Sequence, residues 1–292
     1  MKFSDFRIPE RLEDAGAILK ELGESAYLVA GGTSLVFQKG KGSRTAVDIS
    51  RLGLEGIAED PDGFSIGSGT RIADLAEFRA EGWVLDRVAR LFSTQQVRNI
   101  STLGGNLARI FRWNDFPVAL LALDCAMTVK GDDERVIDGA EYLSSPPHRF
   151  FKDGAILTSV RVGRLPGGAG FGYRKEVRTA ADFSAATAAA AVELDGNKIK
   201  RVRAAVGAAL PFPRRLEKVE KLLTGRAVRR KALGEDAFLK EVAEGAAGIE
   251  WRGQWGLSDE YAGRLAVVTV RDAIADAAAE ASAMGAGEGF NG

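Results

Sequence analysis

Two glycine-rich segments contain the residue types best suited to hold a ligand. The first is an apolar run over 26–30 that leads into Gly-Gly-Thr-Ser-Leu at 31–35, and the second is Thr-Leu-Gly-Gly-Asn at 102–106. Adjacent glycines let the backbone turn sharply and approach a ligand without an intervening Cβ. The N–H groups of such a turn, joined by Thr and Ser hydroxyls, form an anion-binding concavity. We therefore expect the two loops to hold a pyrophosphate from both sides.

Neither segment matches a common nucleotide-binding fingerprint. Lys39 does not follow the first glycine pair at the spacing of a phosphate-binding loop, and neither segment contains Gly-x-Gly-x-x-Gly. An ordinary Rossmann or NTPase domain is therefore not expected. One Gly-Gly pair would be weak evidence of a ligand site in a chain with 35 glycines. The two pairs are informative because they occur together and in this order.

Metal and nucleophile chemistry has few candidate residues. The chain contains one cysteine, Cys125, and one histidine, His148. This excludes a disulfide framework and any zinc or iron–sulfur site of several thiolates within the chain. His148 follows Ser-Ser-Pro-Pro with no nucleophile motif nearby, and we interpret it as a surface loop histidine. We predict no catalytic residue and no metal ligand, so redox chemistry needs a bound cofactor.

Composition excludes several classes of protein and partner. The 292 residues are 46% hydrophobic and 27% charged, as in ordinary globular proteins. Forty basic residues balance forty acidic ones, which makes nucleic acid and membrane surfaces poor partners. No run of about 18 apolar residues occurs, and the N-terminal residues lack a signal-peptide core, so we expect a cytoplasmic protein without membrane insertion.

Strand and helix patterns alternate through the first half of the chain. Helical spacing is predicted over 12–22, 72–78 and 84–92, and strand patterns over 26–30, 46–49, 64–67 and 155–162. Gly23 ends the first helix. Pro-Gly-Gly at 166–168 follows the last of these strands and is the best candidate for a domain boundary.

The second half begins with an alanine-rich stretch over 184–194. Alanine has the highest helix propensity, yet Asp-Gly-Asn at 195–197 is a hairpin turn and 198–206 has strand character. We therefore predict two strands here instead of a helix. Helices are expected around 216–223 and 238–242, and a last one, capped by Ser258, through Ile274; the tail over 285–292 is predicted to be mobile.

At this point the sequence resembles the medium, FAD-binding subunit of the molybdenum hydroxylases, the family of xanthine dehydrogenase and aerobic carbon monoxide dehydrogenase. Members carry Ala-Gly-Gly-Thr-x-Leu, then Gln-x-Arg-Asn before Thr-x-Gly-Gly-Asn. They continue with Asp-x-Pro-x-x-Leu-Leu-Ala-Leu and Lys-x-x-Arg-x-Ala-x-Asp. The matching segments here are 30–35, 96–99, 102–106, 115–123 and 175–182, followed by Trp251-Arg252. The resemblance runs from Phe3 to about Ile274.

This resemblance implies an α+β architecture, the vanillyl-alcohol-oxidase (PCMH)-type FAD-binding fold. The FAD-binding domain would occupy 1–166, with α/β subdomains at about 1–55 and 56–166. A C-terminal lobe over 170–284 would contain a three-stranded antiparallel sheet and helices. The flexible tail would follow at 285–292.

The resemblance also implies which residues bind FAD. Phe92 and Leu157 would touch the flavin or adenine ring, or else pack in the core. Asp115 would accept hydrogen bonds from FAD, or else cap a helix starting at Pro117. Lys175 would reach the flavin, or else be a solvated strand lysine. The backbone of the first segment would wrap the pyrophosphate and ribityl region: Leu28, Val29, Ala30, Gly31, Gly32, Thr33, Ser34 and Leu35. The second subdomain would meet the same ligand with Thr102, Leu103, Gly104, Gly105 and Asn106.

Electron transfer is the function that the resemblance implies. A molybdenum cofactor on a large subunit would oxidise the substrate, [2Fe-2S] clusters on a small subunit would relay electrons, and FAD held noncovalently here would pass them to NAD⁺, a quinone or oxygen. A dimer of heterotrimers is expected. The single cysteine agrees with clusters on other chains, and the missing cysteine-rich insert argues against the hydroxybenzoyl-CoA reductase branch. Substrate choice belongs to the large subunit.

One segment departs from the family pattern. Small residues and a proline usually precede the aspartate, whereas Arg-Ile-Phe-Arg-Trp-Asn stands at 109–114. We hypothesise that Phe111 or Trp113 shields the flavin and that the electron acceptor is not a nicotinamide. Two alternatives stay open: a free-standing flavin oxidoreductase of the same fold, and a structural subunit that has lost FAD.

Overall fold

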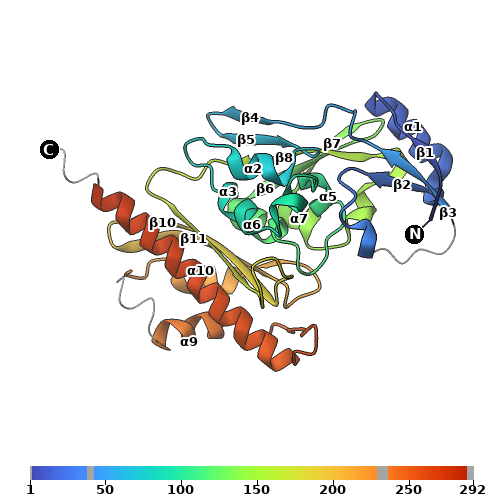
Figure 1. Cartoon of the computed structure of the whole chain (residues 1–292). Helices are drawn as coiled ribbons and strands as arrows, with labels where there is room; N and C mark the ends of the chain where they lie inside the picture. Colours follow the sequence, from blue (N-terminus) through green and yellow to red (C-terminus); the bar gives the residue numbers. More distant parts are fainter. Residues whose placement is uncertain (1, 38–42, 229–235, 288–292) are drawn as a thin grey trace.

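The computed structural model describes residues 2–37, 43–228 and 236–287. Figure 1 shows two parts: an N-terminal part with two sheets, and a C-terminal lobe in which a long helix lies across one sheet. Helices and largely antiparallel sheets occur together throughout. The predicted α+β class is therefore confirmed.

The first sheet positions the first glycine loop. Its strand order is β1 (Lys2–Arg7), β3 (Ser43–Asp48) and β2 (Ala26–Val29), and both pairings are parallel. Helix α1 (Leu12–Leu22) precedes β2 and ends at Gly23, whose φ of 51° suits glycine. Strand β2 ends at Val29, directly before the glycine pair.

The second sheet has five antiparallel strands. Their order is β4 (Ile57–Asp60), β5 (Gly63–Gly67), β8 (Ile156–Gly163), β6 (Cys125–Lys130) and β7 (Glu134–Asp138). The chain between β5 and β6 forms short helices: α2 (Ile72–Glu77), α3 (Leu85–Leu91), α4 (Gln95–Arg98), α5 (Leu103–Leu107) and α6 (Phe116–Leu123), with α7 (Gly139–Leu143) following β7. The second glycine pair lies in α5.

The C-terminal lobe has a four-stranded antiparallel sheet, so the prediction of three strands was one short. The order is β12 (Arg214–Arg215), β11 (Lys198–Gly207), β10 (Ala186–Asp195) and β9 (Gly170–Glu176). With two residues, β12 is too short to produce a periodic sequence pattern. Helices α8 (Glu217–Leu223) and α9 (Asp236–Gly245) precede the long α10 (Asp259–Gly287), which crosses the sheet (Figure 1).

The alanine-rich stretch is a strand, as predicted against its helix propensity. Small side chains on this sheet let α10 approach closely. A Cβ added at Gly172 would lie 2.0 Å from the carbonyl oxygen of Ala273, and one at Gly170 would lie 1.9 Å from that of Ala277. Tertiary packing therefore outweighs the intrinsic preference of alanine.

The last helix is longer than the sequence predicted. Ser258 Oγ accepts from the Tyr261 N–H at 3.1 Å, as expected of a cap. The helix continues to Gly287, so residues 285–287 are helical and not part of a tail. The remaining predicted tail, 288–292, lies outside the described residues.

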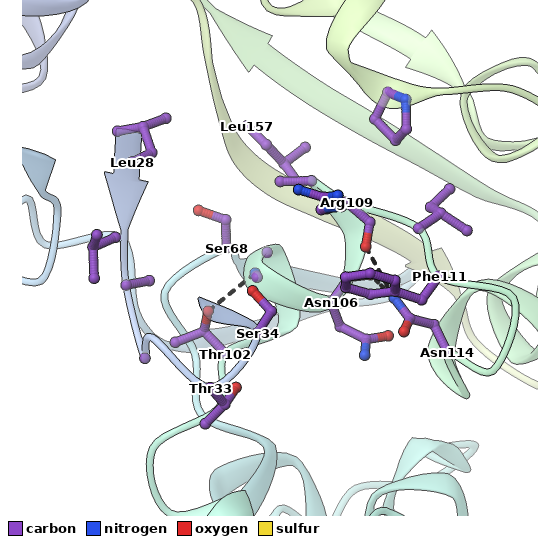
Figure 2. A pocket seen from close by; sticks show the side chains of 18 of the residues that line it. Leu28, Thr33, Ser34, Ser68, Thr102, Asn106, Arg109, Phe111, Asn114 and Leu157 are labelled. Atoms are coloured by element: carbon purple, nitrogen blue, oxygen red, sulfur yellow. Dashed lines mark hydrogen bonds between the residues drawn. The ribbon is translucent and has the colours of Figure 1, made fainter. Parts of the chain in front are cut away.

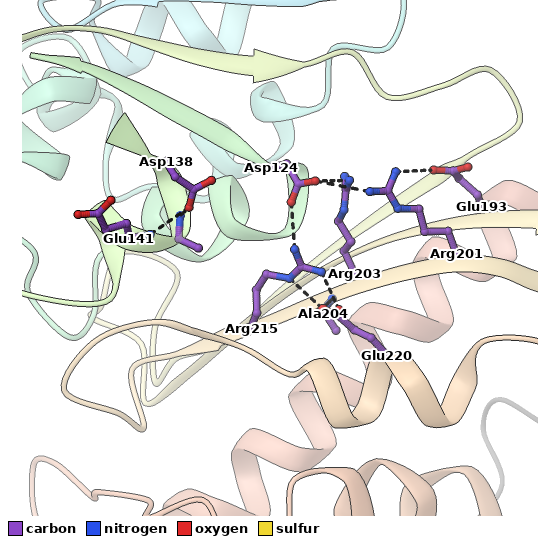
Figure 3. Close-up of polar contacts among 10 residues, drawn as sticks. Asp124, Asp138, Glu141, Glu193, Arg201, Arg203, Ala204, Arg215 and Glu220 are labelled. Carbon is purple, nitrogen blue, oxygen red and sulfur yellow. Dashed lines mark hydrogen bonds and ion pairs between the residues drawn. The ribbon is translucent and has the colours of Figure 1, made fainter. Parts of the chain in front are cut away.

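A cluster of charges joins the two lobes at the end of α6 (Figure 3). Asp124 has a φ of 50° and accepts from Arg215 Nη1 at 3.0 Å, while Arg203 forms a second ion pair with it. Arg215 also pairs with Glu220 at 2.6 Å. Desolvation raises the pKa of Asp124, and the neighbouring arginines counteract that shift. The arginines belong to the C-terminal sheet, so the cluster fixes the position of α6 on that sheet.

Candidate functional site

A cavity of about 1500 Å³ lies where the two glycine segments meet (Figure 2). Its volume exceeds the ~300–1,000 Å³ typical of pockets for drug-sized ligands, so it suits an extended ligand. Both lobes contribute to its lining. The predicted residues that line it are Leu28, Val29, Ala30, Gly31, Gly32, Thr33, Ser34, Leu35, Phe92, Thr102, Gly104, Gly105, Asn106, Asp115, Leu157 and Lys175. Leu103 is the exception, because it is fully buried in the core.

The first loop presents free backbone donors. Within the described residues, the N–H groups of 31–34 donate no hydrogen bond to the protein. Gly32 has a φ of 68°, and its carbonyl accepts from the Leu35 N–H at 3.1 Å, which closes the turn. Consecutive free amides attract an anion. This loop has the geometry predicted for a pyrophosphate.

The second segment differs from the expectation, because its amides are used inside the fold. The N–H groups of Leu103 and Gly104 donate to the carbonyls of Thr70 at 2.9 Å and Ser68 at 2.7 Å. The Gly105 N–H donates to Thr102 Oγ1 at 3.0 Å. Sequence spacing could not show Thr70 and Ser68 as partners, because they lie in a distant turn. The segment therefore lacks the free-amide concavity expected at its glycine pair.

Side-chain oxygens take the place of those amides. Ser68 Oγ and Asn106 Oδ1 are buried and have no hydrogen-bond partner among the described residues. Both residues line the cavity. An unsatisfied buried polar atom costs about 1–3 kcal/mol, so two such atoms at one cavity indicate a polar ligand. Ser68 was not predicted; its only sequence signal is its place between two glycines after a strand.

Two of the glycines are required for close backbone contacts at the cavity. A Cβ at Gly31 would lie 1.7 Å from the carbonyl oxygen of Ile100, and one at Gly104 would lie 2.7 Å from the Ser68 backbone oxygen. Thr33 Oγ1 and Ser101 Oγ are hydrogen-bonded at 3.0 Å beside this contact. The close approach expected toward a ligand is thus also an approach of one loop to the other.

A buried ion pair lies at the cavity wall, between the two lobes. Lys175 Nζ is 3.0 Å from Asp115, and the two side chains are 7% and 6% exposed. The Tyr173 hydroxyl donates to the same carboxylate at 2.6 Å. Burial raises the pKa of Asp115, while Lys175 and Tyr173 counteract that shift. Lys175 is therefore not a solvated strand lysine.

Asp115 occupies the N-cap position of α6, as the alternative expected, but its side chain does not cap the helix. Its side chain makes no capping hydrogen bond, and α6 begins at Phe116 instead of Pro117. Tyr173 was missed by the sequence analysis. It stands two residues before Lys175 on β9, so the strand alternation that places both side chains on one face was the available signal.

The core-packing alternative considered for Phe92 and Leu157 is observed. Both line the cavity. Leu157 is 4% exposed and belongs to the hydrophobic core, and the Phe92 ring lies 6.1 Å from that of Phe116. The core therefore extends to the cavity and forms its apolar side.

The single histidine and the single cysteine lie at the margin of the cavity or outside it. His148 is exposed at the cavity margin. Cys125 lies outside the lining, and burial raises the pKa of its thiol. Over the described residues, no group of three or more His, Cys, Asp or Glu side chains could hold a metal ion. Nor does any described helix have the length and apolar character needed to cross a membrane.

Family models match nearly the whole chain. Residues 1–165 match the FAD binding domain in molybdopterin dehydrogenase. Residues 171–277 match the CO dehydrogenase flavoprotein C-terminal domain. The chain belongs to the family of FAD-binding subunits of the molybdenum hydroxylases, as its motifs predicted. It is thus an FAD-dependent oxidoreductase subunit.

Individual relatives agree with this assignment. The carbon monoxide dehydrogenase medium chain of Afipia carboxidovorans is 29% identical over 95% of this chain and 97% of that protein. The 6-hydroxypseudooxynicotine dehydrogenase complex subunit alpha of Paenarthrobacter nicotinovorans is 32% identical over 69% of this chain and 71% of that protein. Among solved structures, carbon monoxide dehydrogenase from Hydrogenophaga pseudoflava has a TM-score of 0.86 at 26% identity, covering 96% of this chain and 98% of that one.

Gly31→Ala should destabilise the chain and weaken FAD binding together. The new Cβ would overlap the Ile100 carbonyl, and overpacking costs about 1–3 kcal/mol. Urea unfolding and FAD titration would measure both effects. Gly16→Ala, in helix α1, is the control. The added Cβ would lie 3.5 Å from the nearest atom, which is an ordinary contact distance. Equal stability of Gly31→Ala and the wild type would contradict the loop contact.

Lys175→Met should destabilise the chain by about 3–5 kcal/mol, because it leaves the buried Asp115 carboxylate without its cation. The double variant Asp115→Asn with Lys175→Met should recover part of this loss. The deficit of Lys175→Met should also shrink as the pH falls, since a carboxyl whose folded-state pKa is raised favours the folded state when protonated. Urea unfolding between pH 5 and pH 8 would test this. A stability deficit of Lys175→Met that does not change with pH would refute it.

Proposed function

We propose that this chain is the electron-transfer subunit of a cytoplasmic molybdenum-containing hydroxylase or dehydrogenase. It receives electrons from [2Fe-2S] clusters on a small partner subunit and passes them through FAD to an external acceptor. The large partner subunit holds the molybdenum cofactor, and two heterotrimers form a dimer. The names of the relatives, which include two carbon monoxide dehydrogenase medium chains, support this assembly. The single cysteine supports it too, because cluster thiolates must then lie on other chains.

The cavity fits FAD, and its free amides are the observation that carries the proposal. The loop over 28–35 holds the pyrophosphate at its open N–H groups. Ser68 and Asn106 bind polar groups of the same ligand with their unpaired oxygens. Phe92 and Leu157 supply apolar contact to a ring. When bound, FAD supplies the redox chemistry, and this chain binds and orients it without a covalent bond.

The ion pair gives the cavity a fixed polar group at the flavin. Asp115 holds the Lys175 ammonium in place, and Tyr173 orients the carboxylate. A positioned cation stabilises negative charge that develops nearby during reduction. The proposed domains, 1–166 for FAD and 170–284 for the C-terminal lobe, thus meet at this pair. No observation favours a free-standing oxidoreductase or a subunit without FAD.

The purified chain should be yellow and release FAD on acid precipitation. Ser68→Ala should then weaken FAD binding about 2- to 13-fold, the value of one hydrogen bond of about 0.5–1.5 kcal/mol. The unliganded chain should lose no stability, because Ser68 Oγ has no protein partner among the described residues. Absorbance and calorimetric titration would measure both effects.

Ser145→Ala is the matched control. Its Oγ is also buried without a partner among the described residues, yet Ser145 lies outside the cavity lining. FAD affinity should not change in this variant. A colourless chain that takes up no added FAD, alone or with its partner subunits, would contradict the proposed function.

A further inference from the structure

The segment over 109–113 forms a stack at the cavity. The Arg109 guanidinium lies 5.1 Å from the Phe111 ring centroid. The Phe111 and Trp113 rings are 5.1 Å apart and nearly parallel, at 9°. Arg109, Phe111 and Trp113 all line the cavity. Figure 2 shows Arg109 and Phe111 on the side opposite Leu28.

Three more rings, from other parts of the chain, extend this stack into an aromatic wall. Phe37 lies 5.9 Å from Phe111, while Phe183 and Trp255 lie 4.9 Å and 5.8 Å from Trp113. Phe37 follows the first glycine loop, whereas Phe183 and Trp255 belong to the C-terminal lobe. The aromatic wall of these five rings therefore spans both lobes.

Hydrogen bonds to both lobes fix the wall in place. Arg112 is not among the lining residues and donates to the carbonyls of Leu210 at 3.2 Å and Gly253 at 3.3 Å. Its own carbonyl accepts from the Ala208 N–H at 2.9 Å. On the other side of Trp113, Asn114 Nδ2 donates to the Asn106 carbonyl at 2.6 Å. Both neighbours of Trp113 are thus hydrogen-bonded to other segments, which fixes the backbone on each side of this ring.

The wall adjoins the end of the cavity that we assign to the flavin ring. Trp113 stands two residues before Asp115, and both residues line the cavity together with Lys175. The amides of 31–34 also line the cavity, and we assign the pyrophosphate to them. An apolar aromatic surface beside the ion pair suits a flat ring system.

We propose that the aromatic wall selects the electron acceptor by filling the space in which a nicotinamide ring would stack on the flavin. This inference rests on the proposed function. Hydride transfer between a nicotinamide and a flavin moves one proton and two electrons between carbon and nitrogen, and it needs the rings face to face, with reacting atoms about 3–3.5 Å apart. Acceptors that take electrons at the ring edge need no such stacking. Arg112 is a positioning residue, and Phe111 and Trp113 determine specificity.

The test uses the full chain loaded with FAD and NADH as the probe. NADH gives up a hydride from its nicotinamide C4 and becomes NAD⁺, while the oxidised flavin becomes reduced, through the same stacked geometry as the reverse reaction. Anaerobic stopped-flow absorbance should show slow reduction of the wild type. In Phe111→Ala with Trp113→Ala, reduction should be on the order of a hundredfold faster. The rate at which benzoquinone reoxidises the dithionite-reduced flavin should stay within about twofold of the wild-type rate, since an acceptor at the ring edge does not need stacking.

A second readout does not depend on turnover. Acrylamide should quench flavin fluorescence weakly in the wild type and more strongly in the double variant and in Arg112→Ala. Tyr261→Ala is the matched control, because this aromatic residue is 52% exposed on α10 and makes no described ring contact with the wall. It should leave both measurements unchanged.

The outcomes separate this inference from the proposed function. Absence of bound FAD in the wild type would defeat the proposed function. If the wild type binds FAD and NADH reduces it rapidly, the proposed role of the aromatic wall is overturned and the proposed function is not. This holds even if the double variant fails to fold. A folded double variant that binds FAD, yet shows wild-type reduction by NADH and wild-type quenching, would overturn it equally.

Discussion

The burial of α6 on all sides is the constraint on which the two-lobe structure depends. All eight of its residues are buried. A helix that is apolar all round must be enclosed by protein, and α6 contacts both β8 of the second sheet and β10 and β11 of the C-terminal sheet. A Cβ at Gly207 of β11 would lie 2.5 Å from Val118 of α6. The lobes are therefore fixed by one shared core element.

Each end of this helix carries a carboxylate that needs a cation from the other lobe. Asp115 precedes α6 and pairs with Lys175 of β9, and Asp124 follows α6 and pairs with Arg203 and Arg215. A buried charge without a partner is expensive, so the Asp115–Lys175 pair requires that the lobes pack together. The Asp124 side chain is 49% exposed, so its ion pairs contribute less. Since Lys175 also lines the cavity, packing of the C-terminal lobe completes the site.

Sequence patterns predicted the elements well and their mutual contacts poorly. The hairpin around Asp-Gly-Asn was predictable because turn chemistry is local, and strand alternation could have found Tyr173 beside Lys175. Nothing in the spacing could show that the Gly104 amide donates to Ser68, a partner 36 residues away. Leu103 was assigned to the ligand because it stands inside a motif, although its side chain fills the core.

The two glycine segments, alike in sequence, present opposite chemistry to the cavity. The first offers N–H donors, which suit phosphate oxygens. The second offers Asn106 Oδ1, which only accepts, and the turn that it contacts adds Ser68 Oγ, a donor or acceptor. A phosphate there would leave the amide oxygen unpaired, whereas a sugar or ribityl hydroxyl would donate to it. The two sides of the cavity therefore differ in chemistry, with backbone N–H donors at the first loop and side-chain oxygens at and beside the second segment.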